Sequence, residues 1–269
     1  MRRKQWHTPH SPLPTPAPTR YARRMAREPN QSDELFVPVD AMPRPPLSEI
    51  GMSSPRFFPP STATTAEGLL CVGGRLSPDW LLDAYRHGIF PWPMWEDEPV
   101  AWWSPDPRAI IELDDLHISR RLQRTLRSGQ FRVTYDCDFE TVIRGCGTAG
   151  DRTDNTWLTP SMVEAYCHMH ALGHAHSVEV WQANEIVGGT YGMAIGGFFG
   201  AESMFHYVRD ASKVAVVHLV AHLKARGYTL LDIQQLTPHT ERFGAIEIPR
   251  VEYLTRLTTA INQPVTFIG

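Results

Sequence analysis

Three polar side chains lie in otherwise apolar segments of the chain, and their types suit acyl-transfer chemistry. Glu202 is the single carboxylate of the aromatic segment FFGAESMF, and Asp232 and Gln234 end the apolar run that begins at Tyr228. Alternation along a strand places Asp232 and Gln234 on the same face. Buried acidic and amide groups are costly unless something uses them. Each carboxylate alone could equally be a structural ion-pair partner or a strand-end cap, but together the three side chains predict an active site.

The segments around these residues predict a strand, a helix and a second strand. The strand covers 198–205, and the helix begins at Asp210 or Ser212 and ends at Gly227. Upstream we expect strands at 108–113, 131–135, 177–181 and 186–195 and helices at 119–128, 138–146 and 160–172, and downstream a short helix capped at Thr237-Pro238 and a last helix from about Arg250. A meander, then a helix, then a central strand is the order of the acetyltransferase-like (GNAT-like) fold. We therefore predict an α/β (α+β) protein with a mixed sheet.

Composition divides the chain into three predicted parts. Thirteen of the 23 prolines lie within residues 1–60, and the start of the chain has an excess of basic residues. Residues 1–56 are therefore predicted to be a disordered Pro-rich arm, either inert or weakly attracted to RNA. Residues 57–105 are rich in tryptophan and loops and predict a small N-terminal domain with an aromatic core. Residues 106–269 form the expected GNAT-like catalytic domain.

Charge and cysteine usage limit the class of protein. The net charge is −3, so any nucleic acid must be met by a local patch. The four cysteines form no C-x-x-C pair, which favours free thiols in a reducing compartment. No apolar run is long enough to span a bilayer. We expect a cytoplasmic, monomeric protein that does not use a membrane.

One glycine motif imitates a phosphate-binding loop. Gly145, Gly147 and Gly150 satisfy G-x-G-x-x-G, and Arg144 with Gly147 also matches the loop that holds the pyrophosphate of acetyl-CoA. Such loops need a strand before the glycines and a helix after them, whereas the preceding segment here is predicted to be helical. We expect no phosphate loop, so an acyl donor other than acetyl-CoA is required.

A run of histidines imitates a metal site. Cys167, His168, His170, His174 and His176 are close in sequence. However, positions 168 and 170 point to different sides of a helix, and Gly173 ends the helix before His174. We therefore expect histidines of the core and surface around a helix end, and no metal.

The densest basic stripe in the predicted folded part lies on the helix expected at 119–128. It consists of Arg120, Arg121, Arg124 and Arg127. Positions 120, 124 and 127 share one helical face, and no acidic residue occurs from 116 to 135. The stripe is either a solvated charged face or a contact surface for the phosphates of RNA.

Ten segments resemble those of the leucyl/phenylalanyl-tRNA–protein transferase family, in the family's order. They are EGLLCVGGRLSP, YRHGIFPW, WWSPDPRA, LHISR, LGHAHSVEVW, GGTYG, AESMF, ASKVA, LLDIQ and GAIEIPR. The resemblance covers about residues 57–257, and it is specific because it does not depend on one short motif. Residues 1–56 have no counterpart in it.

The resemblance implies transfer of Leu, Phe and in some cases Met from aminoacyl-tRNA to the α-amino group of proteins with N-terminal Arg or Lys, which feeds N-end-rule degradation. It implies Asp232 and Gln234 as the catalytic pair and Glu202 near the incoming amine. In this chemistry Asp232 accepts positive charge, either as a true base or as a positioning group. It implies an aminoacyl-adenosine site of Tyr85, Trp92 and Trp157 and an apolar pocket of Phe199, Val216 and Leu219. Thr190 departs from the family's pattern, in which methionine is expected, and adds a polar wall to that pocket.

The chemistry implied by the resemblance agrees with the residues. An aminoacyl ester is already activated, so no cofactor, ATP or metal is required. Two rivals remain from other classes: an RNA-binding module without catalysis, and an acetyl-CoA-dependent N-acetyltransferase, against which the absence of a phosphate loop argues.

Overall fold

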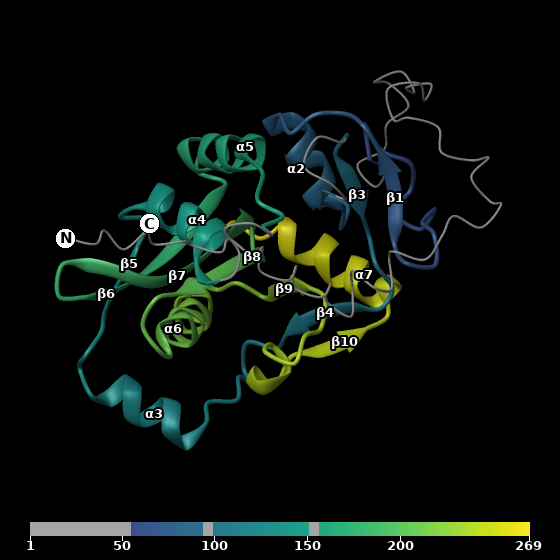
Figure 1. Cartoon of the computed structure of the whole chain (residues 1–269). Helices are drawn as coiled ribbons and strands as arrows, with labels where there is room; N and C mark the ends of the chain where they lie inside the picture. The colour runs from purple at the N-terminus through teal and green to yellow at the C-terminus, as the bar shows by residue number, and fades with distance from the viewer. Residues whose placement is uncertain (1–54, 94–98, 151–155) are drawn as a thin grey trace, which may run out of the picture. The chain divides into compact units, whose positions relative to one another are not determined.

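The larger of two sheets is a seven-stranded mixed sheet with the strand order β10-β4-β9-β8-β7-β6-β5 (Figure 1). The computed structural model describes residues 55–93, 99–150 and 156–269. The predicted arm at 1–56 therefore lies outside the described residues except for its last two positions. No helix in the described residues is long and apolar enough to cross a membrane.

Three consecutive strands, β6 (Ala175–Gln182), β7 (Glu185–Ile195) and β8 (Phe198–His206), form the antiparallel meander that the sequence predicts. Strand β5 (Arg132–Tyr135) pairs antiparallel with the first of them. Tight turns join β6 to β7 and β7 to β8, where Ala183 and Gly196 adopt positive φ of 52° and 53°. Because β7 is buried along nearly its whole length, it is covered on both faces.

Helix α6 (Ala211–Arg226) carries the chain from β8 to β9 (Leu230–Gln234), which pairs parallel to β8. The helix begins and ends as predicted, with Asp210 as its N-cap residue and Gly227 in the left-handed conformation after it. The side chain of Asp210 makes no cap hydrogen bond and instead pairs with Lys213 at 2.9 Å. Meander, helix and parallel central strand confirm the predicted GNAT-like order.

Strand β9 is central because β4 (Arg108–Ile111) covers its other edge. Strand β10 (Ile246–Ile248) pairs with β4, and α7 (Arg250–Ile261) follows it. All neighbours of β4 in the sheet are antiparallel, whereas β9 has one parallel and one antiparallel neighbour. Strand β9 therefore lies inside the sheet, with a paired strand on each side.

Helices cover both faces of the sheet. Helices α4 (Phe139–Thr148) and α5 (Pro160–Ala171) lie on the face opposite α6 (Figure 1). Each face has its own hydrophobic cluster, and the successive residues Phe198 and Phe199 of β8 enter different clusters. This follows from the alternation of side chains along a strand.

The tryptophan-rich segment forms a small antiparallel sheet, in the order β1 (Leu69–Val72), β3 (Ala101–Trp103) and β2 (Phe90–Pro91), beside α2 (Pro78–Arg86). Phe57 stacks on Trp80 with ring centroids 4.7 Å apart, and Phe58 contacts Trp102 at the same distance. The predicted aromatic core is confirmed. A domain boundary at 105/106 stays a prediction, because all described residues lie in one contact unit spanning Val37–Gly269.

Three of the helices that precede β6 begin at or next to their predicted starts. Ser119, Asp138 and Thr159 each accept a hydrogen bond from the backbone N–H three residues later, at the starts of α3 (Arg120–Arg127), α4 and α5. The prediction that a short helix begins at Thr237-Pro238 is wrong in its position. A 3₁₀ helix, η5 (Glu241–Phe243), forms instead, because the Thr237 and Thr240 side chains bond to each other and to the backbone between them.

Two glycines of α4 give a matched test of packing against the sheet. A Cβ at Gly145 would lie 2.7 Å from the Phe205 ring, whereas a Cβ at Gly147 would meet nothing nearer than Leu158 at 3.7 Å. Gly147→Ala should raise the free energy of unfolding by about 0.5–1 kcal/mol through helix propensity. Gly145→Ala should lower it by about 1–3 kcal/mol through overpacking. Urea unfolding of both variants checks this, and effects of the same sign would contradict the packing.

Candidate active site

Asp232 is fully buried at the point where β9 leaves β8, and all its acceptor positions are engaged. Arg108 Nε and Nη2 donate to its Oδ1 and Oδ2 at 2.8 and 2.6 Å. The Tyr253 hydroxyl donates to Oδ2 and the Gln234 backbone N–H to Oδ1, both at 2.9 Å. The carboxylate is therefore the centre of a buried bidentate ion pair.

Arg108 is a site residue that the sequence interpretation missed. It begins β4, is 1% exposed, and donates from Nη1 to the Gly88 carbonyl at 3.0 Å. Its guanidinium also lies over the rings of Phe90 and Tyr253. Burial lowers the pKa of Arg108, but the Asp232 carboxylate more than offsets this and raises it above its usual value. An arginine at the head of the apolar run RAII was the available signal.

Glu202 lies in a second polar network next to the first. The Tyr85 hydroxyl donates to its Oε1 at 2.7 Å and the Tyr166 hydroxyl to its Oε2 at 3.3 Å, and the two hydroxyls are 2.6 Å apart. Although Glu202 as a residue is half-buried, its carboxyl group is surrounded by these side chains. Burial raises the pKa of Glu202 from 4.5 to about 8, against the hydrogen bonds from Tyr85 and Tyr166, which lower it.

Gln234 joins the two networks. Its backbone N–H bonds to Asp232, and its side-chain Nε2 donates to Glu202 Oε1 at 3.2 Å. Its φ of 58° is unusual for a residue other than glycine, and such backbone strain persists only where the surroundings fix it. The left-handed turn interrupts the strict alternation expected along this strand. The hydrogen bond to Asp232 is what holds the turn.

Pairing between β8 and β9 stops at this site. The parallel register runs from Phe198↔Leu230 to Gly200↔Asp232 and no further, although β8 continues to His206. Beyond this pair the two strands diverge, and the next side chains that face each other are Glu202 of β8 and Gln234 of β9. The site therefore lies where β8 and β9 separate, between the two faces of the sheet.

The remaining predicted residues fall into separate groups. Trp92 and Trp157 stack with centroids 4.6 Å apart and pack against the cluster that contains Tyr85. Phe199, Val216 and Leu219 meet in the other cluster, on the α6 face. Thr190 is buried, and its hydroxyl donates to the Ser203 carbonyl at 2.9 Å, so this polar group is satisfied within the sheet.

The predicted arginines of α3 are all exposed and lie away from the carboxylates. Arg121 pairs with Asp210 at 3.6 Å, and within the described part of the chain the other three arginines form no ion pair. A cavity of about 630 Å³ lies beside this helix. Its lining is His117, Ser119, Leu122, Lys213, His239, Glu241, Arg242, Phe243 and Gly244.

The glycine motif has no phosphate-binding geometry. Gly145 and Gly147 lie inside α4, where backbone N–H groups are engaged by the helix. This confirms the expectation drawn from the sequence.

Comparison with known proteins gives a consistent result along the chain. Residues 110–258 match the family model described as leucyl/phenylalanyl-tRNA protein transferase, and residues 74–106 match the N-terminal domain of the same family. A leucyl/phenylalanyl-tRNA–protein transferase of Solidesulfovibrio magneticus is 53% identical over 77% of this chain and 83% of its own length. One of Pseudomonas syringae pv. syringae is 48% identical over 77% and 91%.

Likeness to solved structures is distant. A GCN5-related N-acetyltransferase from Kribbella flavida aligns with a TM-score of 0.35 and 13% identity, over 63% of this chain and 60% of that one. The sequence relatives are far closer, and both segments of their family are matched in order. This chain belongs to the leucyl/phenylalanyl-tRNA protein transferase family.

Proposed function

We propose that this chain transfers Leu or Phe, with Met as a further donor residue, from aminoacyl-tRNA to the α-amino group of proteins that begin with Arg or Lys. The product enters N-end-rule degradation, and the reaction takes place in the cytoplasm on a monomer. The observation that carries the proposal, beside family membership, is the Glu202–Gln234–Asp232 arrangement where β8 and β9 diverge. A small domain at 57–105 and a catalytic domain at 106–269 are part of the same proposal.

The reaction demands little from the protein beyond placement. The ester of an aminoacyl-tRNA is already activated, and an α-amine with a pKa of about 7.7–8.0 is partly neutral at pH 7. Holding amine and ester in attack geometry can contribute about 7–11 kcal/mol. Residues that fix positions are therefore as important here as residues that move protons.

We assign Asp232 a positioning role in place of the proton-accepting role that the family resemblance suggested. Its carboxylate is buried against Arg108 and has no free acceptor position for an amine. What it does contribute is the hydrogen bond that holds Gln234 in its left-handed turn and aims the amide at Glu202. Gln234 cannot take a proton, so it orients the incoming group.

Glu202 is better suited to receive the proton of the amine. With a pKa of about 8 it titrates in the same range as an α-amine, which is efficient for proton transfer. A cationic N-terminal Arg or Lys beside it would favour its ionised form, so acceptor binding and deprotonation of Glu202 are linked.

The donor amino acid and its adenosine have separate places in this proposal. The side chain of Leu or Phe enters the apolar group of Phe199, Val216 and Leu219 on the α6 face, through the point where β8 and β9 part. The stacked pair Trp92 and Trp157 holds the adenosine, with Tyr85 at its border. An apolar slot distinguishes such side chains by only about 1–3 kcal/mol, which suits several donors.

The tRNA body would meet the arginines of α3. Arg120, Arg124 and Arg127 are exposed, and Lys213 and Arg242 line the cavity next to them. Arg121, which pairs with Asp210, contributes less.

We predict that the stability of the fold depends strongly on both members of the buried Arg108–Asp232 ion pair. Arg108→Met should lower the free energy of unfolding by about 3–5 kcal/mol, because it leaves a buried carboxylate unpaired. Adding Asp232→Leu should recover much of the loss. Arg256→Met, which breaks a pair that is 37% exposed, should cost under about 1 kcal/mol. Urea unfolding measures all three, and equal costs for Arg108 and Arg256 would contradict the assignment.

The raised pKa of Glu202 predicts a pH dependence of stability. Between pH 4.5 and about 8 the folded protein keeps a proton that the unfolded chain has released. This stabilisation is fully present below pH 4.5 and is lost as the pH rises through about 8. The unfolding free energy should therefore fall over this range more steeply in the wild type than in Glu202→Gln. The exposed Glu140→Gln variant is the control, and parallel pH curves for wild type and Glu202→Gln would refute the shift.

The transfer reaction itself is tested with labelled Leu-tRNA and a peptide that begins with Arg. The wild type should label the peptide, and an N-acetylated peptide should stay unlabelled. Glu202→Gln should lower kcat by about 10²–10⁴ if it receives the proton. Acetylation of the peptide from acetyl-CoA without aminoacyl transfer would favour an acetyltransferase, and tRNA binding without any transfer would favour a binding module.

Charge reversal tests the α3 surface. Changing Arg120, Arg124 and Arg127 to Glu should weaken tRNA binding and flatten its salt dependence by about one unit per lost phosphate contact. The matched control reverses Arg56, Arg144 and Lys224, which are also exposed. Filter binding between 50 and 200 mM salt, roughly the range in which such contacts dominate, measures both. Equal affinities would make the stripe a solvated face.

A further inference from the structure

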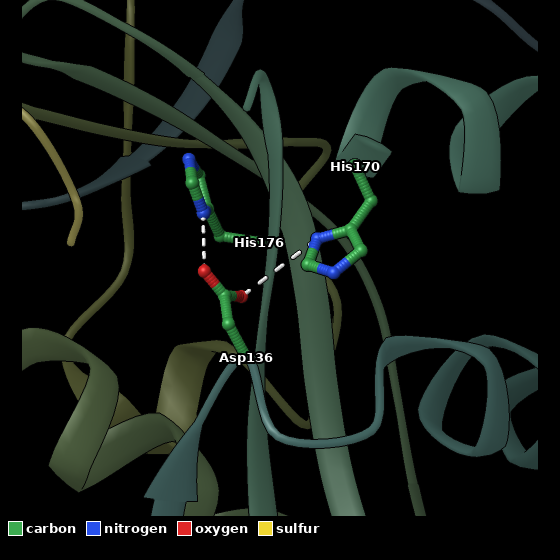
Figure 2. A group of neighbouring side chains, drawn as sticks. All are labelled: Asp136, His170 and His176. Atoms are coloured by element: carbon green, nitrogen blue, oxygen red, sulfur yellow. Dashed lines mark hydrogen bonds and ion pairs between the residues drawn. The ribbon is translucent and has the colours of Figure 1, made fainter. Parts of the chain in front are cut away.

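Two histidines of the run at 168–176, His170 and His176, lie beside Asp136. This carboxylate was not among the residues singled out from the sequence. Asp136 lies in the turn between β5 and α4, His170 in the last turn of α5, and His176 near the start of β6 (Figure 2). Asp136 Oδ2 is 2.6 Å from His176 Nδ1, and Oδ1 is 4.0 Å from His170 Nδ1. One donor atom of each residue lies within 4.8 Å of the other two.

These separations are close to those of a tetrahedral metal. With bonds of about 2.0–2.1 Å to nitrogen and oxygen, two ligand atoms of a tetrahedral Zn²⁺ lie about 3.3 Å apart. One measured separation is shorter than this and the other is longer. The two separations involve different oxygens of Asp136, so the side chains must shift for one oxygen to bind a metal beside both nitrogens.

The rings are already held in place by stacking. His170 stacks on Phe139 with an interplanar angle of 6°, and His176 stacks on Phe267 at 17°. Asp136 is fixed in a left-handed conformation (φ 55°), and its Oδ1 accepts from the Ser177 backbone N–H at 2.8 Å. Such outer contacts orient ligands in metal sites and leave Oδ2 as the coordinating oxygen.

We propose that Asp136, His170 and His176 form a binding site for a divalent transition metal of the Zn²⁺ class. A carboxylate and two imidazoles suit this class, and the set is poor in the oxygen ligands that Ca²⁺ and Mg²⁺ need. Both histidines coordinate through Nδ1, so each neutral ring moves its proton to Nε2. His170 would then give up its 2.8 Å hydrogen bond to the Ala175 carbonyl.

The site would join three elements near the candidate active site. His170 follows Tyr166 by one turn of α5, and Tyr166 contacts Glu202. A metal there fixes the end of α5 to the sheet, so its role is structural, and its detection does not depend on the transferase activity.

The alternative is a set of hydrogen bonds without a metal, and Asp136→Asn separates the two. Asparagine keeps an oxygen acceptor for Ser177 or His176 and tolerates the left-handed conformation, but it removes the anionic ligand. His170→Gln removes a second ligand at a half-buried position. The control His168→Gln changes an exposed histidine on the same helix. Cys137→Ser tests whether the exposed neighbouring thiol binds metal instead.

The experiment titrates the chelator-treated full chain with Zn²⁺ by calorimetry and with Co²⁺ by visible absorption. The expected result is one metal per chain with a tetrahedral Co²⁺ spectrum and a raised unfolding temperature with Zn²⁺. Asp136→Asn and His170→Gln should each weaken binding at least about 100-fold, beyond the effect of losing an outer contact. His168→Gln and Cys137→Ser should bind as the wild type does.

Three outcomes would overturn the proposal. They are no stoichiometric binding by the wild type, equal binding by wild type and Asp136→Asn, and loss of binding only in Cys137→Ser. Near-ultraviolet circular dichroism of each metal-free variant verifies that it is folded.

Discussion

The buried pair of Arg108 and Asp232 is the interaction on which the site depends. It ties the head of β4 to the end of β9, and it lies with both side chains at most 1% exposed. Two charges in such surroundings are stable only with good geometry and with their other positions satisfied. Tyr253, Gly88 and the Gln234 backbone supply those further contacts. The pair thereby gives the Gln234 turn, at the end of the central strand β9, a fixed support.

The divergence of β8 and β9 gives that support its use. Strand pairing ends at Gly200↔Asp232. The side chains of Glu202 and Gln234, which follow, contact each other. On one face the tyrosine network surrounds the Glu202 carboxyl group, and on the other α6 contributes an apolar cluster. The proposed site therefore has a polar network on one face of the sheet and an apolar cluster on the other.

Neighbouring carboxylates acquire different chemical roles from their surroundings alone. Asp232 accepts two hydrogen bonds from a guanidinium, which hold its carboxylate in place. Glu202 has hydroxyl and amide partners but no cation bonded to it, and burial raises its pKa to about 8. Nothing in the residue types distinguishes these two fates. The partner that decides is more than a hundred residues away in the chain, at the start of another strand.

The sequence by itself determined the local elements and much of the site's membership. Hydrophobic periodicity and caps such as Ser119 and Thr159 predicted the helices, since these signals act within a few residues. The isolated polar residues Glu202, Asp232 and Gln234 were visible because burying them is costly. The short strands β1, β2, β3 and β10 were missed, because two to four residues hold too little periodicity.

Only the tertiary structure decided which groups meet. Arg108 contacts Asp232, Tyr166 contacts Glu202, and Asp136 lies near His170 and His176, because strands and helices that are far apart in the sequence pack together. Helical geometry correctly separated His168 from His170, but it could not show that a turn after another strand brings a carboxylate beside the latter. Charge and proton affinity depend on such neighbours and on burial, and both are properties of the folded chain.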